Sequence, residues 1–205
     1  MRVWSVAFTA LACVVVFAPC AQQESGTASQ RQRETELAVI ETKFGSIVIE
    51  FFEESAPSHA ANFRKLVRDG FYDGVTFHRV VPGFVIQGGD PNSKDDDRSN
   101  DGIGGPGYTV EAEIGLKHER GFVAAARRPD QVNPKRESSG SQFFICLTEL
   151  PSLDGAYTVF GKVVDGMDVV DQIAAVDRDE RDNPVEKVEM IRAYLKVSRP
   201  SDEQD

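Results

Sequence analysis

The side chains best suited to chemistry lie between Phe77 and Asp90, in the run FHRVVPGFVIQGGD. This run combines one fixed positive charge, Arg79, with large aromatic side chains and the amide of Gln87. Alternation along a strand places Phe77, Arg79 and Val81 on one face of a sheet. An arginine beside a phenylalanine is either a surface residue whose stem covers apolar area or a charged group set into an apolar pocket that binds a ligand. Spacing alone leaves both interpretations open.

Two motifs that look catalytic are excluded by their spacing. The glycine-rich loop Gly102–Gly107 resembles a phosphate-binding loop, but Pro106 interrupts it, and the strand-like run Tyr108–Val110 follows where a helix is needed. We therefore expect a tight turn there and no bound nucleotide. A serine hydrolase needs the pattern Gly-x-Ser-x-Gly, and Ser139-Gly140-Ser141 lacks that spacing.

The histidines and the acidic runs do not predict a metal site or an acid–base pair. His59, His78 and His118 are not spaced as paired metal ligands, and the cysteines are too few for a zinc site. We expect these histidines to be structural or to lie on the surface. The runs Asp95–Asp97 and Asp177–Asp182 are typical of solvated loops.

The elements that must position these residues are mostly short strands. Leu37–Thr42 and Ile47–Phe51 are rich in β-branched residues, and the Gly-bearing turn between them predicts a hairpin. A helix is expected to begin at Pro57 and to end at Gly70, and a second helix fits Met167–Ala174, where the apolar residues share one face. Further strand-like runs are Val75–Val80, Gly121–Ala126, Gln142–Leu147, Thr158–Val164 and Lys187–Val197. Many short strands with two helices indicate a barrel or a sandwich.

The chain begins with an apolar segment that is typical of an export signal. After Arg2, residues 3–18 are nearly all apolar, a run too short for a comfortable membrane span. We therefore expect an exported, periplasmic protein. Its predicted organisation is a signal peptide over residues 1–20, a flexible polar tether over 21–36, a folded domain over 37–198 and a polar tail over 199–205.

The fate of the signal depends on Cys20. The segment Phe17-Ala18-Pro19-Cys20 resembles the box that precedes the lipidated cysteine of a bacterial lipoprotein, although Phe17 and Pro19 are unusual in it. Lipidation of Cys20 competes with cleavage after Cys20 or Ala21, and an uncleaved N-terminal anchor is a third alternative. Only a lipid at Cys20 or such an anchor would tether the protein to a membrane.

Charge and cysteine content exclude several classes of protein. The 205 residues contain 23 Lys and Arg against 33 Asp and Glu, a formal net charge of −10. This acidic balance argues against a nucleic-acid binder and against adsorption to anionic lipid. Cys13 and Cys20 lie in the signal, so Cys146 is the lone cysteine of the body and has no partner for an internal disulfide. Its apolar neighbours predict an inert core residue.

The run Phe77–Asp90 resembles the signature of the cyclophilin family of peptidyl-prolyl cis-trans isomerases. The resemblance continues at GSQFFI (140–145), LDG (153–155) and VFGKV (159–163), and it covers residues 37–197. It implies an all-β fold, a closed eight-stranded antiparallel β-barrel capped by two α-helices, with which the strands and helices predicted above are compatible. It also implies a packed barrel interior, so the substrate site is expected on an outer face.

The resemblance further implies a catalytic group and its surroundings. Arg79 is then the main catalytic residue, because a guanidinium can stabilise the lone pair that develops on the prolyl nitrogen as the amide twists. Phe84, Phe144 and Leu153 are expected to form the apolar pocket for the proline ring, and Gln87 to bind a backbone carbonyl of the peptide. The expected substrate-binding set is completed by Gln142, Tyr157 and the segment that pairs with the peptide backbone, Ala126 and Arg127.

The implied partners are proline-containing polypeptides, namely unfolded or folding exported proteins. No metal, cofactor or nucleic acid is expected, and we expect a monomer. Two alternatives to an active isomerase stay open. One is a non-catalytic module or chaperone that grips proline segments, and the other is an unrelated barrel that binds small ligands.

The sequence departs from the family pattern around the expected pocket. Val85 and Ala125 stand where methionines are frequent, Ser152 where an aromatic residue is common, and Tyr157 where histidine is common. Without an aromatic residue at position 152, cyclosporin binding is expected to be weak. Residues 129–139 form a segment that looks longer and more charged than usual.

Overall fold

The computed structural model describes Met1 and residues 35–198, which include the whole of the expected folded domain. The expected signal peptide with Cys20, nearly all of the tether and the polar tail lie outside the described residues. The first strand starts at Thr35, slightly before Leu37, where the sequence predicted the fold to begin. Among the described residues, no helix is both long and apolar enough to span a membrane.

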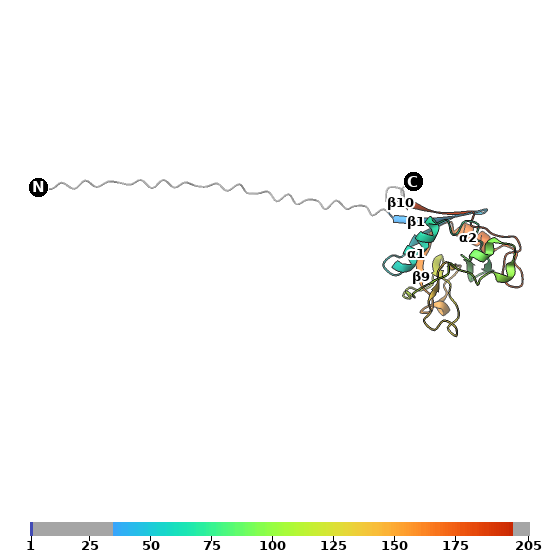
Figure 1. Ribbon diagram of the computed structural model, residues 1–205. Coiled ribbons are helices and arrows are strands. Elements are labelled where there is room, and N and C mark those ends of the chain that lie inside the picture. The colour runs from blue at the N-terminus through green and yellow to red at the C-terminus, as the bar shows by residue number, and fades with distance from the viewer. Residues whose placement is uncertain (2–34, 199–205) are drawn as a thin grey trace. The chain divides into compact units, whose positions relative to one another are not determined.

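An eight-stranded antiparallel sheet forms the body of the fold (Figure 1). Its strands are adjacent in the order β10-β1-β2-β9-β6-β8-β4-β3. Their bounds are β1 Thr35–Thr42, β2 Gly45–Phe51, β3 Arg79–Val81, β4 Val85–Gly88, β6 Phe122–Ala125, β8 Phe143–Cys146, β9 Val159–Asp165 and β10 Arg192–Ser198. A separate small sheet pairs β5 (Thr109–Val110) with β7 (Ser138–Ser139).

Backbone hydrogen bonds just before β3 and β10 join the two ends of the sheet. The N–H groups of Gly74 and Phe77 donate to the carbonyls of Met190 and Val188 at 2.8 and 2.9 Å, and the Met190 N–H donates to the Val75 carbonyl at 2.8 Å. The sheet is therefore a closed barrel, as the family resemblance implied. Closure matters because it removes the unpaired edges that an open sheet would expose.

The predicted hairpin at the start of the domain is present as β1 and β2. Thr42 pairs with Gly45 across the turn, and the Thr42 hydroxyl donates to the Gly45 carbonyl at 2.9 Å. Gly45 has φ +131°, and a Cβ there would lie 2.9 Å from a methyl group of Val169. Both the backbone conformation and the close approach of Val169 therefore require glycine at this position.

Two α-helices pack on the barrel where the sequence predicted them (Figure 1). α1 (Pro57–Arg68) starts at the proline, which suits the first turn of a helix, and ends before Gly70 at φ +66°. α2 (Met167–Ala174) has the predicted bounds. α1 packs against β9 and β10, and α2 against β2, β3 and β4. Three short 3₁₀ helices are η1 Pro91–Lys94, η2 Arg98–Asn100 and η3 Pro151–Leu153.

Buried apolar side chains form two clusters, one on each face of the sheet. The larger cluster fills the barrel, where the Phe63 ring lies 4.8 Å from the ring of Tyr72 and 5.3 Å from that of Phe143. The smaller cluster lies on the outer face and includes Phe144 and Cys146. Alternation along β8 produces this division, because successive side chains point to opposite faces. The outer cluster gives the site described below a packed base of its own.

The alternation predicted around Phe77 is wrong. β3 starts only at Arg79, and Phe77 lies before it, fully buried in the barrel with Val80. Phe77 instead takes part in closing the barrel through its backbone, so the period of two does not extend from residue 77 to residue 79. The aromatic neighbours of Arg79 therefore come from other strands and turns.

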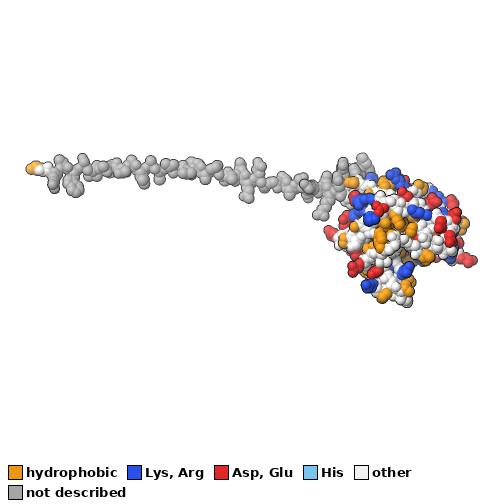
Figure 2. All heavy atoms as spheres, viewed as in Figure 1, with side chains coloured by type: hydrophobic (Ala, Val, Ile, Leu, Met, Phe, Trp, Pro, Cys, Tyr) orange, Lys and Arg blue, Asp and Glu red, His pale blue; other side chains and the backbone are white. Residues whose placement is uncertain are grey.

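Charged side chains of both signs cover the face of the molecule seen in Figure 2, with hydrophobic side chains gathered near its centre. Over the described part of this face, Lys and Arg alternate with Asp and Glu and form no continuous basic stripe.

Candidate active site

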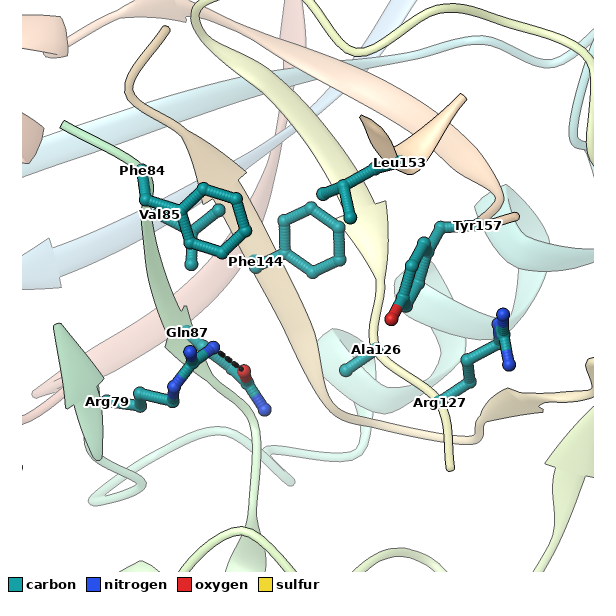
Figure 3. A pocket seen from close by; sticks show the side chains of 9 residues that line it. All are labelled: Arg79, Phe84, Val85, Gln87, Ala126, Arg127, Phe144, Leu153 and Tyr157. Atoms are coloured by element: carbon teal, nitrogen blue, oxygen red, sulfur yellow. Dashed lines mark hydrogen bonds between the residues drawn. The ribbon is translucent and has the colours of Figure 1, made fainter. Parts of the chain in front are cut away.

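One pocket on the outer face of the barrel collects almost all of the predicted site residues (Figure 3). Its volume is about 180 Å³. It is lined by Arg79, Phe84, Val85, Gln87, Ala126, Arg127, Phe144, Leu153 and Tyr157. Only Gln142 of the predicted set is missing from this lining, because it is buried behind Gln87.

The strand register brings the polar and apolar sides of the pocket together. Arg79 on β3 lies opposite Gln87 on β4, and Gln87 lies opposite Phe144 on β8. Ala124 on β6 also pairs with Phe144. Paired residues of neighbouring strands present their side chains on the same face, so this row of pairs places a cation, an amide and an aromatic ring side by side.

A tight turn between β3 and β4 sets the position of Phe84. Gly83 adopts φ +71°, and the Phe84 N–H donates to the Val81 carbonyl at 3.0 Å. The Phe84 carbonyl in turn accepts from the Leu147 N–H at 2.9 Å. These bonds hold the Phe84 ring at the rim, across the opening from Leu153 (Figure 3).

A chain of hydrogen bonds orients the polar side of the pocket. Arg79 Nη1 donates to Gln87 Oε1 at 3.4 Å, and Gln87 Nε2 donates to Gln142 Oε1 at 3.1 Å. Gln142 Nε2 donates onward to the Gly104 carbonyl at 2.8 Å, and the Gly104 N–H donates to Asp90 at 2.9 Å. The loop that the sequence predicted to be a tight turn is thus the anchor of this chain.

The charge of Arg79 is free to act on a ligand. Within residues 35–198, no carboxylate lies within ion-pair distance of its guanidinium. Among the described residues, its side chain hydrogen-bonds only to the neutral amide of Gln87. A cation beside an apolar surface interacts more strongly with a ligand dipole than it does in water, because the local dielectric is lower.

The apolar side of the pocket is a cup of aromatic and aliphatic side chains. The Tyr157 ring meets the Phe144 ring edge-on, with centroids 5.7 Å apart and an interplanar angle of 84°. Leu153 ends the 3₁₀ helix η3, and its N–H donates to the Leu150 carbonyl at 3.0 Å. A cup of this size, bordered by one cation and one amide, suits a small apolar ring flanked by polar amide groups.

His118 supports this cup from behind, a role that the sequence analysis missed. It is 2% exposed, and its ring stacks on Phe144 at 6.0 Å with an interplanar angle of 11°. Its Nδ1 lies 3.0 Å from Asp154 Oδ1, and its backbone N–H donates to the same oxygen at 2.8 Å. No local pattern could have signalled this pairing, since the two residues are far apart in the sequence.

The other two histidines are also buried and structural, as expected. His59 Nδ1 lies 2.6 Å from Glu113 Oε2, and the same carboxylate accepts the backbone N–H groups of Ser58 and His59 at the start of α1. His78 is buried with neither ring nitrogen hydrogen-bonded to any described residue. Across the described part of the chain, no three His, Cys, Asp or Glu side chains are grouped as metal ligands.

Acidification is expected to destabilise the fold through these histidines. Burial lowers the pKa of His59, although Glu113 partly opposes the shift, and burial likewise lowers the pKa of His78 against the opposing charges of Asp90 and Asp101. The unfolded chain therefore binds protons that the folded chain does not. The free energy of unfolding should therefore fall as pH drops below about 6.5, the ordinary pKa of a histidine in the unfolded chain.

Urea unfolding at pH 7.5 and pH 5.0 measures this effect. The variant His78→Asn removes one of the titrating groups and should lose less stability than the wild type over the same interval. An identical loss in both proteins, or a gain on acidification, would contradict the assignment.

Cys146 is inert, as predicted. It is fully buried on the outer face of β8. Burial, with a smaller contribution from Asp154, raises the pKa of its thiol to about 12. The nucleophilic thiolate is therefore absent at neutral pH.

Comparison with known proteins agrees with this geometry. The family model described as cyclophilin type peptidyl-prolyl cis-trans isomerase matches residues 37–195. A peptidyl-prolyl cis-trans isomerase of Helicobacter pylori is 41% identical over 148 residues, which are 70% of this chain and 83% of that protein. A peptidyl-prolyl cis-trans isomerase-like 1 of Gibberella zeae is 37% identical over 157 residues, 77% of this chain and 93% of that protein.

A solved structure has the same fold. It is the crystal structure of a Cryptosporidium parvum cyclophilin type peptidyl-prolyl cis-trans isomerase in the presence of the dipeptide Ala-Pro. It superposes with a TM-score of 0.70 and 30% sequence identity over 79% of this chain and 99% of that one.

Proposed function

Because this chain belongs to the family of cyclophilin type peptidyl-prolyl cis-trans isomerases and is itself such an isomerase, we propose that it works on exported proteins as they fold. Members of the family bind proline-containing peptides. We also propose which side chains carry out the reaction and in which compartment the protein works. One observation supports the site in particular: the guanidinium of Arg79 has no carboxylate partner among the described residues and borders the apolar cup.

The reaction is rotation about the peptide bond that precedes proline. Partial double-bond character gives this rotation a barrier of about 18–20 kcal/mol, so the uncatalysed change takes tens of seconds or longer. An acceleration of roughly 10⁵-fold corresponds to about 7 kcal/mol off the barrier. No covalent bond breaks. The site needs only to bind the twisted amide more tightly than either planar form.

Arg79 supplies the differential binding in our proposal. As the bond twists, the prolyl nitrogen loses its conjugation and regains a lone pair. A guanidinium N–H directed at that lone pair stabilises the twisted state and has little to bind in the planar states. The hydrogen bond to Gln87 orients the guanidinium before substrate binds. Little conformational entropy is then lost when the guanidinium meets the twisted amide.

The remaining lining residues hold the substrate in register. We assign the proline ring to the cup formed by Phe84, Phe144 and Leu153. Gln87 Nε2 carries two N–H groups, of which one donates to Gln142. The second is available for a backbone carbonyl of the peptide. Isomerisation of an Ala-Xaa-Pro peptide by the full chain, followed spectroscopically, tests the function, and a rate equal to the uncatalysed one would refute it.

The proposed place of work is outside the cytoplasm, on the strength of the apolar segment at residues 3–18. Intact-mass spectrometry of protein recovered from cells that process the signal is expected to show the loss of the first 19 to 21 residues. A mass increment that disappears in Cys20→Ser would identify a lipid at that cysteine, and its absence would identify simple cleavage. Recovery of a chain that still starts at Met1 would contradict export by a cleaved signal.

A further inference from the structure

The wall of the pocket that carries Tyr157 lies between two elements and is joined to the sheet at its end, where the Ala125 N–H of β6 donates to the Thr158 carbonyl at 2.9 Å. Residues 154–158 connect η3 to β9, and Gly155 within them adopts φ +70°. Turns of this kind have little intrinsic rigidity, because few backbone hydrogen bonds fix them. Side-chain contacts from outside the segment therefore help to set the position of the Tyr157 ring.

Arg127 holds this segment from one side. Its side chain is only 6% exposed. Its Nε donates to the Ala156 carbonyl at 2.7 Å, and its guanidinium carbon lies 4.6 Å from the centroid of the Tyr157 ring. Figure 3 shows the Arg127 side chain turned toward Tyr157 and away from Gln87. The arginine predicted to accompany the peptide thus uses its charged group to support the wall.

Arg136 holds the neighbouring carbonyl in the same way. Its Nη1 donates to the Gly155 carbonyl at 2.7 Å. Its backbone lies in the left-handed region at φ +56°, and its N–H donates to the Asn133 carbonyl at 3.0 Å. The long charged segment noted in the sequence therefore folds back against the turn that carries Tyr157.

A single carboxylate connects the two arginines. Asp130 Oδ1 lies 2.5 Å from Arg127 Nη1, and Asp130 Oδ2 lies 2.9 Å from Arg136 Nη2. Hydrogen bonds from Arg136 and then Arg127 lower the pKa of Asp130, so the carboxylate stays ionised at neutral pH. Without that charge, two guanidinium groups would face each other across the gap and repel.

We propose that Asp130 is a positioning residue of the isomerase: by binding Arg127 and Arg136 together, it fixes residues 155–157 and thereby the Tyr157 ring, which packs edge-on against Phe144 in the cup assigned to the proline ring. This inference rests on the proposed function of the pocket. The line of contacts runs from Asp130 through Arg127 to Tyr157 and on to Phe144. Asp130 itself is absent from the pocket lining, so it acts through the wall.

We expect the wall to contact the substrate equally in its planar and twisted forms, because it lies away from the Arg79 side of the pocket. Loosening it should therefore weaken binding in both states and raise KM without lowering kcat. In Asp130→Asn, which keeps the size of the side chain and removes its charge, we expect KM for an Xaa-Pro peptide to rise about fivefold while kcat changes less than about twofold.

Asp171→Asn is the matched control. Asp171 binds Arg120 at 2.7 Å, and Arg120 Nη1 also donates to a backbone carbonyl, that of Leu147, at 2.7 Å. This pair has the same chemistry as the Asp130–Arg127 pair, is more exposed, and lies at a place that does not line the pocket. Asp171→Asn should leave both KM and kcat unchanged.

Arg136→Gln is a second variant, in case Asp130→Asn does not fold. It removes the hydrogen bond to the Gly155 carbonyl and leaves the Arg127–Asp130 pair in place. We therefore expect a smaller rise in KM than in Asp130→Asn. The proposal is overturned if folded Asp130→Asn keeps the wild-type KM, or if its kcat falls while KM does not rise. If Asp130→Asn does not fold, a wild-type KM in Arg136→Gln overturns the proposal. An equal rise in KM in Asp171→Asn overturns it as well. An inactive wild-type protein would instead refute the function of the pocket, so the two failures are distinguishable.

Discussion

Replacing Arg79 by alanine is expected to lower kcat/KM for an Xaa-Pro peptide by about 10²-fold or more, the size of effect seen when one preorganised donor is removed from a transition state. The loss should fall on kcat, because the guanidinium acts on a lone pair that forms only as the amide twists. The side chain is half-buried at the rim and has no carboxylate partner among the described residues. Its removal therefore leaves no buried charge unpaired, and the fold should remain intact.

Two further variants show whether the shape of the group matters as well as its charge. Arg79→Lys keeps a positive charge but lacks the planar fork that can contact Gln87 and the substrate together. Its activity should lie between those of the wild type and Arg79→Ala. Arg192→Ala removes an exposed arginine that lies over Tyr194, away from the pocket, and should have no effect. Full activity in Arg79→Ala would remove Arg79 from the mechanism.

Truncating Phe144 to alanine should have the second large effect, on both stability and binding. The side chain is 5% exposed and joins the outer cluster to the pocket, with His118 behind it and Tyr157 at its edge. Loss of a buried phenylalanine costs about 3–5 kcal/mol of unfolding free energy. The cup also loses its base, so we expect KM to rise about tenfold or more, which corresponds to about 1.4 kcal/mol of binding.

Phe63→Ala separates these two effects. Phe63 is 3% exposed and lies in the barrel interior against Phe51, Tyr72, Phe143 and Phe160. Its truncation should destabilise the protein by a similar amount, measured by urea unfolding, while the folded fraction keeps the wild-type KM. An equal rise in KM in Phe63→Ala and Phe144→Ala would mean that KM rises because the fold is destabilised, and would contradict a direct role of Phe144 in binding.

Local sequence patterns correctly predicted the elements that are determined by residues close together in the sequence. The bounds of α2 follow from apolar residues at helical spacing, and the β1–β2 hairpin follows from two β-branched runs around Gly45. The burial of Cys146 follows from its apolar neighbours in β8. The same reasoning failed at Phe77, because the regular strand starts two residues later and the backbone before it closes the barrel instead.

The site could be predicted only through resemblance to a family, and then only in part. Which strands pair is decided by long-range packing, so no local pattern places Arg79, Gln87 and Phe144 in one row. The resemblance named Arg127 for its place on the peptide-pairing segment. It could not predict that the Arg127 side chain binds the Ala156 carbonyl, which is far away in the sequence, or Asp130, which lies in the longer segment 129–139. The catalytic and binding roles of the lining residues remain predictions.

Exchange NMR on a saturating Xaa-Pro peptide tests the role of Arg79 most directly, because it measures cis-trans exchange on the enzyme separately from binding. With the wild-type protein, bound cis and trans forms should interconvert many times per second. With Arg79→Ala, the exchange rate should fall about 10²-fold while the dissociation constant changes less than about threefold. An unchanged exchange rate in Arg79→Ala would contradict the proposed stabilisation of the twisted amide.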